Sequence, residues 1–180
     1  MKTAVIFTSQ TRFTRKYAEW IAQALQADLF ELPEARKTDL SVYDGLIYGG
    51  WISAGSVQGL SRFREILKKV PCRKAAIFCV GASPAESPSI PEFLDRNFSG
   101  EEKERISVFY FPGGFLPEAL PFASRMMMKG FISLLRKKKE KTEEEKEMVQ
   151  MLSSSYDLSD RKYILPLCEL FQDQNGYPKE

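Results

Sequence analysis

Short apolar runs alternate along the chain with segments in which apolar residues recur every three or four positions. The apolar runs predict strands over residues 2–8, 28–31, 45–49, 75–81 and 106–111. The helical spacing predicts helices over residues 14–26, 60–70 and 91–97. This alternation favours an α/β fold, a three-layer sandwich built on a five-stranded parallel sheet of order 2-1-3-4-5 with helices on both faces.

The last third of the chain adds more helix than such a sheet needs. Apolar spacing predicts an amphipathic helix over residues 121–135, followed by the basic run 136–141. Thr142 and Glu145 have the spacing of a capping box, which predicts a further helix carrying Met148 and Met151. We expect a single domain over residues 1–180, with an extra helical segment over about 115–155, a final helix and a loose tail over 174–180.

The first strand leads directly into a hydroxyl-rich segment and then a helix. Ser9, Thr11 and Thr14 lie where the strand ends and the helix begins. The first N–H groups of a helix have no partner within it and carry partial positive charge, so this junction predicts a phosphate site. The chain has neither a Gly-x-x-x-x-Gly-Lys run nor a Gly-x-Gly-x-x-Gly run there. The alternative is a helix start that Thr11 or Thr14 merely caps.

This segment resembles the N-terminal pattern of the flavodoxins. The matching residues are Val5, Ile6, Phe7, Ser9, Thr14, Ala18 and Ile21. The resemblance implies a flavodoxin-like, FMN-binding domain. The residues it places around the FMN phosphate are Ser9, Gln10, Thr11, Arg12, Phe13 and Thr14.

Arg12 departs from the pattern, which asks for a small residue there. A glycine would turn the backbone tightly, whereas an arginine adopts positive φ only at a cost. Three interpretations stand side by side. In the first, the turn keeps φ negative and Arg12 adds a cation to the phosphate. In the second, the loop is distorted and binds the phosphate weakly. In the third, Arg12 is a surface residue without a role.

The resemblance also assigns three further segments to the flavin. A loop over 50–59 flanks the isoalloxazine ring with Gly50, Trp51, Ile52, Ser53, Ala54 and Gly55. Gly81, Ala82 and Ser83 face its pyrimidine side, and Gly113 and Gly114 form the far wall. The alternative for each is ordinary turn chemistry. No aromatic residue directly follows the strand over 75–81, which predicts an open flavin face beside an apolar slot of Phe115, Leu116 and Phe122.

The layout of the whole chain is similar to the branch that contains the menaquinone-dependent protoporphyrinogen dehydrogenases. The shared features are Tyr43-Asp44 before the third strand, Gly113-Gly114 after the fifth, and a Met- and Phe-rich helix with basic flanks. We expect an FMN-binding redox protein, either an electron carrier or a quinone-linked oxidoreductase. The alternatives are a protoporphyrinogen dehydrogenase proper, or a degenerate, non-catalytic module that no longer holds flavin.

The composition limits the ligands and partners that we expect. A net charge of +2 favours no nucleic acid, and the absence of histidine excludes imidazole catalysis and histidine-ligated metals. We therefore expect no metal, no catalytic side chain, and a redox partner protein or a quinone as electron partner. Three widely spaced cysteines, no signal-peptide pattern and no membrane-spanning run indicate a cytoplasmic protein. Residues 122–141 suit peripheral membrane contact, although a core helix with a solvated charged end is the favoured interpretation.

Overall fold

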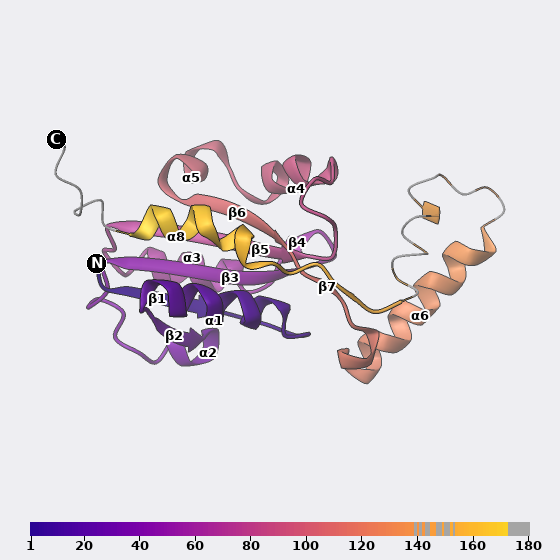
Figure 1. The fold of residues 1–180 in the computed structure, drawn as a ribbon, viewed down its shortest axis with the longest axis horizontal. Helices are drawn as coiled ribbons and strands as arrows, with labels where there is room; N and C mark the ends of the chain where they lie inside the picture. The colour runs from indigo at the N-terminus through magenta and orange to yellow at the C-terminus, as the bar shows by residue number, and fades with distance from the viewer. Residues whose placement is uncertain are drawn as a thin grey trace.

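The computed structural model describes residues 1–138, 140, 142, 145–146, 149, 152 and 154–172. Its centre is a parallel sheet in the order β2-β1-β3-β5-β6, which confirms the predicted order 2-1-3-4-5 of the five parallel strands (Figure 1). The strands are β1 (Thr3–Phe7), β2 (Asp28–Glu31), β3 (Gly45–Ser53), β5 (Lys74–Gly81) and β6 (Ser107–Pro112).

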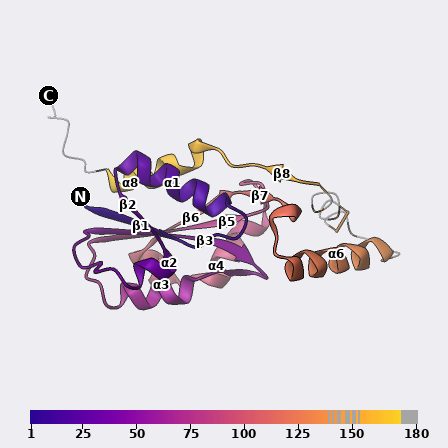
Figure 2. The same ribbon diagram turned by 90° about the horizontal axis from the view of Figure 1, so that it is seen from below.

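Helices cover both faces of this sheet, as Figure 2 shows. One face carries α1 (Phe13–Leu25) and α8 (Leu165–Phe171), which follows the short helix η2 (Arg161–Ile164). The other carries α2 (Leu32–Ala35), α3 (Leu60–Leu67) and α4 (Ser89–Asn97). The short helix α5 (Gly100–Arg105) leads from α4 into β6.

Two hydrophobic cores lie on opposite faces of the sheet, and β1 contributes to both. Val5 and Phe7 pack with the residues of α1 and α8, whereas Ala4 and Ile6 pack with those of α2 and α3. Alternate side chains of a strand point to opposite faces. A strand covered on both faces therefore carries apolar residues at successive positions, which is why β1 contains the continuous apolar run Ala4–Phe7.

The third strand is longer than the sequence indicated. We expected a loop from Gly50, but β3 continues to Ser53 and folds back as β4 (Ser56–Val57) through an antiparallel hairpin. The prediction was wrong because β5 extends beyond the end of β1, so its pairing with β3 continues to Trp51. Gly50 makes room for the returning strand, since a Cβ there would lie 2.6 Å from a methyl group of Val57.

The additional segment forms a projecting helix, α6 (Phe122–Lys137). The chain reaches it through β7 (Gly114–Phe115) and the short helix η1 (Pro117–Ala119), and returns through β8 (Tyr156–Asp157), which pairs with β7. The helix was predicted correctly, but its interpretation as a core helix was wrong: α6 buries none of its residues and stands clear of the sheet (Figures 1 and 2). Both faces of the sheet are already covered by other helices.

The predicted capping box after α6 is confirmed. The Thr142 N–H donates to the Glu145 carboxylate over 3.0 Å, and the Glu145 N–H donates to the Thr142 hydroxyl over 3.2 Å. Met148, Met151 and the tail over 174–180 lie outside the described residues. Among the helices that the structure describes, none combines the length and apolarity that crossing a membrane requires.

Candidate functional site

The candidate site lies at the carboxyl edge of the sheet, where the parallel strands end. Phe7 of β1 pairs with Gly49 of β3, which pairs in turn with Phe78 of β5. The segments that follow these three positions therefore leave the sheet from one edge. In a sheet of this order the crevice between the first and third strands is where ligands bind.

The loop between β1 and α1 occupies this crevice. The Thr8 N–H donates to the Gly49 carbonyl over 3.0 Å, which ties the start of the loop to β3. Helix α1 begins at Phe13, and its N-cap is Arg12, with no side-chain hydrogen bond to the first turn. The interpretation of Thr11 or Thr14 as a cap is therefore wrong, and no cap side chain competes with a ligand for the first N–H groups of the helix.

Ser9 provides the clearest sign of a ligand. Its Oγ is buried and has no hydrogen-bond partner within the described part of the chain. Leaving a buried polar group unpaired costs about 1–3 kcal/mol, and buried hydroxyls in folded proteins are therefore nearly always hydrogen-bonded. Thr14, in the first turn of α1, is also buried. An unpaired hydroxyl beside an uncapped helix start is the donor set that a phosphate group requires.

Arg12 adopts a left-handed backbone, with φ at 73°. The interpretation in which φ stays negative is therefore wrong. The loop keeps the positive-φ turn that a small residue would favour, at a cost of about 1–2 kcal/mol for a residue with a side chain. The Arg12 side chain is exposed, and its carbonyl accepts the first helical bond of α1 from the Lys16 N–H over 2.9 Å.

At the ends of β3 and β5, four of the predicted residues line a cavity of about 260 Å³. They are Ile52, Gly81, Ala82 and Ser83, and residues of α4 and β6 close the cavity. Phe93 and Tyr110 are among the latter, so aromatic rings do lie beside this loop even though none follows β5 directly in the sequence. The residues of the β1–α1 loop do not line this cavity.

Two tyrosines that the sequence did not single out hold the loop after β5. The Tyr110 hydroxyl donates to the Ser83 carbonyl over 2.8 Å, and the Tyr156 hydroxyl donates to the Ala82 carbonyl over 3.1 Å. Burial raises the pKa of both hydroxyls, so both remain protonated donors at neutral pH. Tyr110 could have been noticed as the polar group within an apolar strand, whereas nothing near Tyr156 in the sequence points to Ala82.

Gly113 and Gly114 pack against the start of α1. The Gly113 N–H donates to the Gly81 carbonyl over 2.7 Å, and a Cβ on Gly114 would lie 2.8 Å from the Phe13 ring. The structure thus brings three of the predicted segments into contact. The predicted slot is not formed: Phe115 is buried, Phe122 is 76% exposed, and the cavity beside Phe115 includes neither Leu116 nor Phe122.

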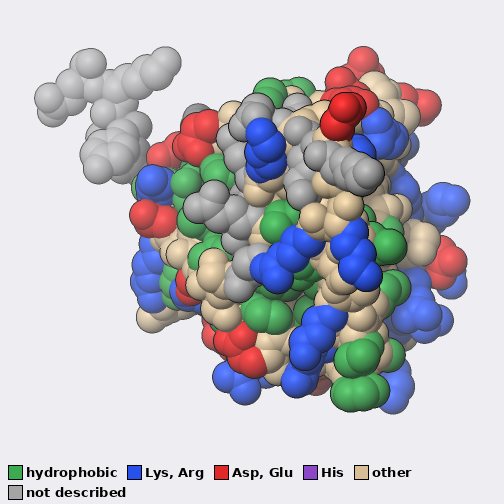
Figure 3. Space-filling view, turned by 90° about the vertical axis from the view of Figure 1, so that its right-hand side faces the viewer, with side chains coloured by type: hydrophobic (Ala, Val, Ile, Leu, Met, Phe, Trp, Pro, Cys, Tyr) green, Lys and Arg blue, Asp and Glu red, His purple; other side chains and the backbone are tan. Residues whose placement is uncertain are grey.

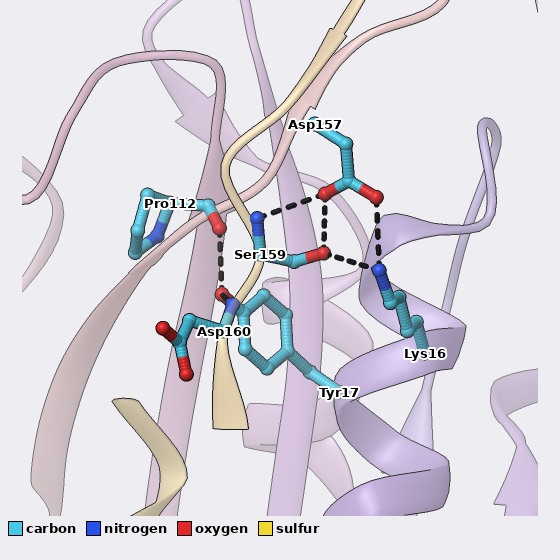
Figure 4. Close-up of polar contacts among 6 residues, drawn as sticks. All are labelled: Lys16, Tyr17, Pro112, Asp157, Ser159 and Asp160. Atoms are coloured by element: carbon cyan, nitrogen blue, oxygen red, sulfur yellow. Dashed lines mark hydrogen bonds and ion pairs between the residues drawn. The ribbon is translucent and has the colours of Figure 1, made fainter. Parts of the chain in front are cut away.

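An ion pair fixes the first turn of α1 to the segment returning from α6 (Figure 4). The Lys16 ammonium lies 2.8 Å from the Asp157 carboxylate and 2.7 Å from the Ser159 hydroxyl. Partial burial acts to raise the pKa of Asp157, but the hydrogen bonds from Lys16 and Ser159 outweigh it and hold the pKa below its usual value. Sequence reasoning missed this contact because about 140 residues separate its two sides.

The next residue of α1, Tyr17, makes a second connection in the same region. Its buried hydroxyl donates to the Pro112 carbonyl over 2.6 Å and accepts from the Asp160 N–H over 3.2 Å (Figure 4). The hydroxyl thus links α1, the end of β6 and the chain before α8. Together with the ion pair of Lys16, it holds the start of α1 in place beneath the β1–α1 loop.

The chain is similar to a known protein family and to several solved structures. The family model described as a flavodoxin domain matches residues 4–145. Flavodoxin 1 from Bacillus cereus is 18% identical, with 71% of this chain and 97% of that one covered and a TM-score of 0.43. A flavoprotein from Lactobacillus acidophilus, solved in complex with FMN, is 16% identical, with 62% and 91% covered and a TM-score of 0.43.

A third solved structure, a WrbA-like flavodoxin from Agrobacterium tumefaciens, is 17% identical, with 61% of this chain and 82% of that one covered and a TM-score of 0.41. A search of curated protein sequences gave no match.

Proposed function

Because this chain belongs to the flavodoxin-domain family, whose model spans residues 4–145, we propose that it binds FMN and passes electrons between that flavin and a redox partner. The observation that supports this most strongly is the buried, unpaired hydroxyl of Ser9 beside the uncapped start of α1. A phosphate there accepts hydrogen bonds from Ser9 and from the helix N–H groups. The helix dipole offsets part of its charge, so no lysine is required.

The flavin ring then lies along the same edge of the sheet. Two backbone segments are assigned to it: residues 51–55 of the β3–β4 hairpin, and residues 81–83 at the end of β5. Tyr110 and Tyr156 hold the second segment in position through the carbonyls of Ser83 and Ala82. Residues 113–114 support the first turn of α1 from the far side.

Bound FMN supplies the redox chemistry, accepting and releasing electrons, and this chain binds and orients it. We assign no acid, base or nucleophile. The electron partner we propose is a redox protein or a quinone. The insertion of α6 between β6 and α8 supports assignment to the branch of the protoporphyrinogen dehydrogenases. Three free cysteines agree with a cytoplasmic location.

Variants at the two buried hydroxyls test the assignment. Ser9→Ala and Thr14→Val each remove one donor, and hydrogen bonds to charged groups contribute about 1.5–3 kcal/mol. FMN affinity measured by calorimetry should fall roughly tenfold or more for each variant. Thr38→Val is the matched control, because the Thr38 hydroxyl bonds the Glu34 carbonyl beyond α2, away from the loop. Unchanged FMN affinity in both site variants would contradict the proposal.

The strained backbone of Arg12 supports one alternative, a degenerate site in a non-catalytic binding module. The spectrum of the purified protein separates the two functions. A redox protein retains or takes up flavin and shows the visible absorption of the cofactor itself. A degenerate module remains colourless even after incubation with excess FMN.

A further inference from the structure

The outward face of α6 is apolar and exposed. Residues spaced three or four apart lie on one side of a helix, and on this side they are Ala123, Met126, Met127, Gly130, Phe131 and Leu134. Met127 is 72% exposed and Leu134 is 71% exposed. Single exposed apolar residues are normal on a protein surface, whereas a contiguous face of this kind indicates an interaction site.

Positive charge is concentrated on the same segment. Residues 122–141 contain seven Lys and Arg residues and one Glu, whereas the rest of the chain contains 19 basic and 23 acidic residues. Helix α6 itself has no acidic residue. Figure 3, which views this end of the molecule, shows a column of Lys and Arg side chains among hydrophobic ones, with Asp and Glu mainly around the edge.

The cations of α6 lie mainly on the flank opposite the apolar face, and one lies near the end of that face. Arg125, Lys129 and Arg136 line a cavity of about 500 Å³ on the flank of α6 nearer the protein, and Lys137 is exposed near the end of the helix. Lys138 is paired with Glu145 at 2.6 Å. The helix therefore presents an outward apolar face with Lys137 near its end, further cations on its inner flank, and no carboxylate of its own.

A second copy of this chain is a poor occupant of the face. Two α6 helices packed through this face would bring two basic segments close together, with no acidic residue on either helix to offset their repulsion. A single helix of 16 residues is also only about 24 Å long, which gives a smaller contact than the roughly 800 Å² per partner of a stable interface.

We propose that α6 lies in the surface of a bilayer rich in anionic lipid. The apolar face enters the boundary between head groups and acyl chains, and Lys137 lies among the lipid phosphates, while the cations on the inner flank of the helix add to the attraction. A length of about 24 Å is less than the roughly 30 Å of the hydrocarbon core, so the helix lies along the surface and does not cross it.

This orientation also concerns the candidate site. Both α6 and the β1–α1 loop lie beyond the carboxyl edge of the sheet (Figures 1 and 2). Docking through α6 therefore brings that edge close to the membrane. If the proposed function holds, the flavin then lies near a lipid-soluble electron acceptor, but binding of α6 to the bilayer requires no flavin.

Co-sedimentation of the full-length protein with vesicles tests the proposal. Vesicles of phosphatidylcholine and phosphatidylglycerol in equal parts should bind the protein, and phosphatidylcholine alone should bind it far more weakly. Met127→Glu combined with Leu134→Glu should lower the partition coefficient at least about 30-fold. Lys137→Gln should lower it about fivefold on the anionic vesicles and little on the neutral ones.

Val42→Glu is the matched control, because Val42 is also an exposed apolar residue but precedes β3, at the opposite edge of the sheet. It should leave vesicle binding unchanged. Leu134→Trp should shift its fluorescence to shorter wavelength on the anionic vesicles. The proposal fails if the double variant binds as well as the parent. It also fails if the parent binds no vesicles, whether it is a monomer or forms a dimer that the double variant dissociates.

Discussion

Replacing Arg12 by glycine should stabilise the protein, although it removes a charged residue from the candidate site. The residue has φ at 73°, and its exposed side chain makes no capping bond. Relief of a left-handed backbone is worth about 1–2 kcal/mol, and the added freedom of glycine in the unfolded chain offsets about 0.5–1 kcal/mol of it. The free energy of unfolding should therefore rise by about 0.5–1 kcal/mol, or roughly 2 °C in Tm for a chain of this size.

Two further variants separate backbone strain from charge. Arg12→Ala removes the guanidinium but keeps a Cβ, so it should not stabilise the protein. Gln26→Gly changes the exposed residue at the other end of α1, which has φ at 51°, and should stabilise the protein without altering FMN affinity. Urea unfolding of all three gives the comparison. If Arg12→Gly is no more stable than Arg12→Ala, the reasoning from backbone strain is refuted.

The same variants decide what Arg12 does for the flavin. If the guanidinium pairs with the phosphate, Arg12→Gly and Arg12→Ala should both weaken FMN binding, and the loss should shrink at high salt because of screening. If the strain opposes binding, Arg12→Gly alone should strengthen it. Equal affinity in all three proteins at every ionic strength would assign Arg12 no role in binding.

Three further predictions concern stability. Gly114→Ala should destabilise the protein by about 1–3 kcal/mol, because its Cβ would lie 2.2 Å from the Tyr156 carbonyl oxygen, whereas Gly100→Ala, in open space, should not; thermal unfolding compares them. Asp157 has a lowered pKa, so the stability it contributes is fully present above its pKa in the unfolded chain and is lost as the pH falls through its pKa in the folded protein. Between about pH 5 and about pH 2, the free energy of unfolding should therefore fall less for Asp157→Asn than for the parent, as urea unfolding would show. Phe122→Ala should change the free energy of unfolding by less than about 0.5 kcal/mol, not the roughly 3–5 kcal/mol of a core position, because Phe122 is 76% exposed.

The sheet was predictable because its central strands, β1, β3 and β5, are buried on both faces. A continuous apolar run such as that of β5 is typical of a strand between two layers of helices, and the connections between the strands determine their order. The extension of β3 past Gly49 was not predictable, because it depends on how far the neighbouring strand β5 extends. Local patterns carry no information about the length of a partner strand.

Part of the candidate site could likewise be predicted from the sequence, and part could not. The loop over Ser9–Thr14 was predictable, because a strand, a hydroxyl-rich turn and a helix follow one another directly in the sequence. The hydrogen bonds from Tyr156 and Asp157 were not predictable, because these residues belong to the part of the chain that follows α6, far from the loop in the sequence. The amphipathic spacing of α6 predicted a helix correctly but could not show that the sheet has no uncovered face left for it.

The most direct test compares FMN with riboflavin, which has the same ring but no phosphate. Titration of the flavin-free protein, followed by flavin fluorescence, gives both affinities. If the Ser9–Thr14 loop holds the phosphate, FMN should bind roughly 100-fold or more tightly than riboflavin, since two or more bonds to a charged group are lost without it. Equal affinities for the two flavins, or no binding of either, would contradict the assignment of this loop as a phosphate site.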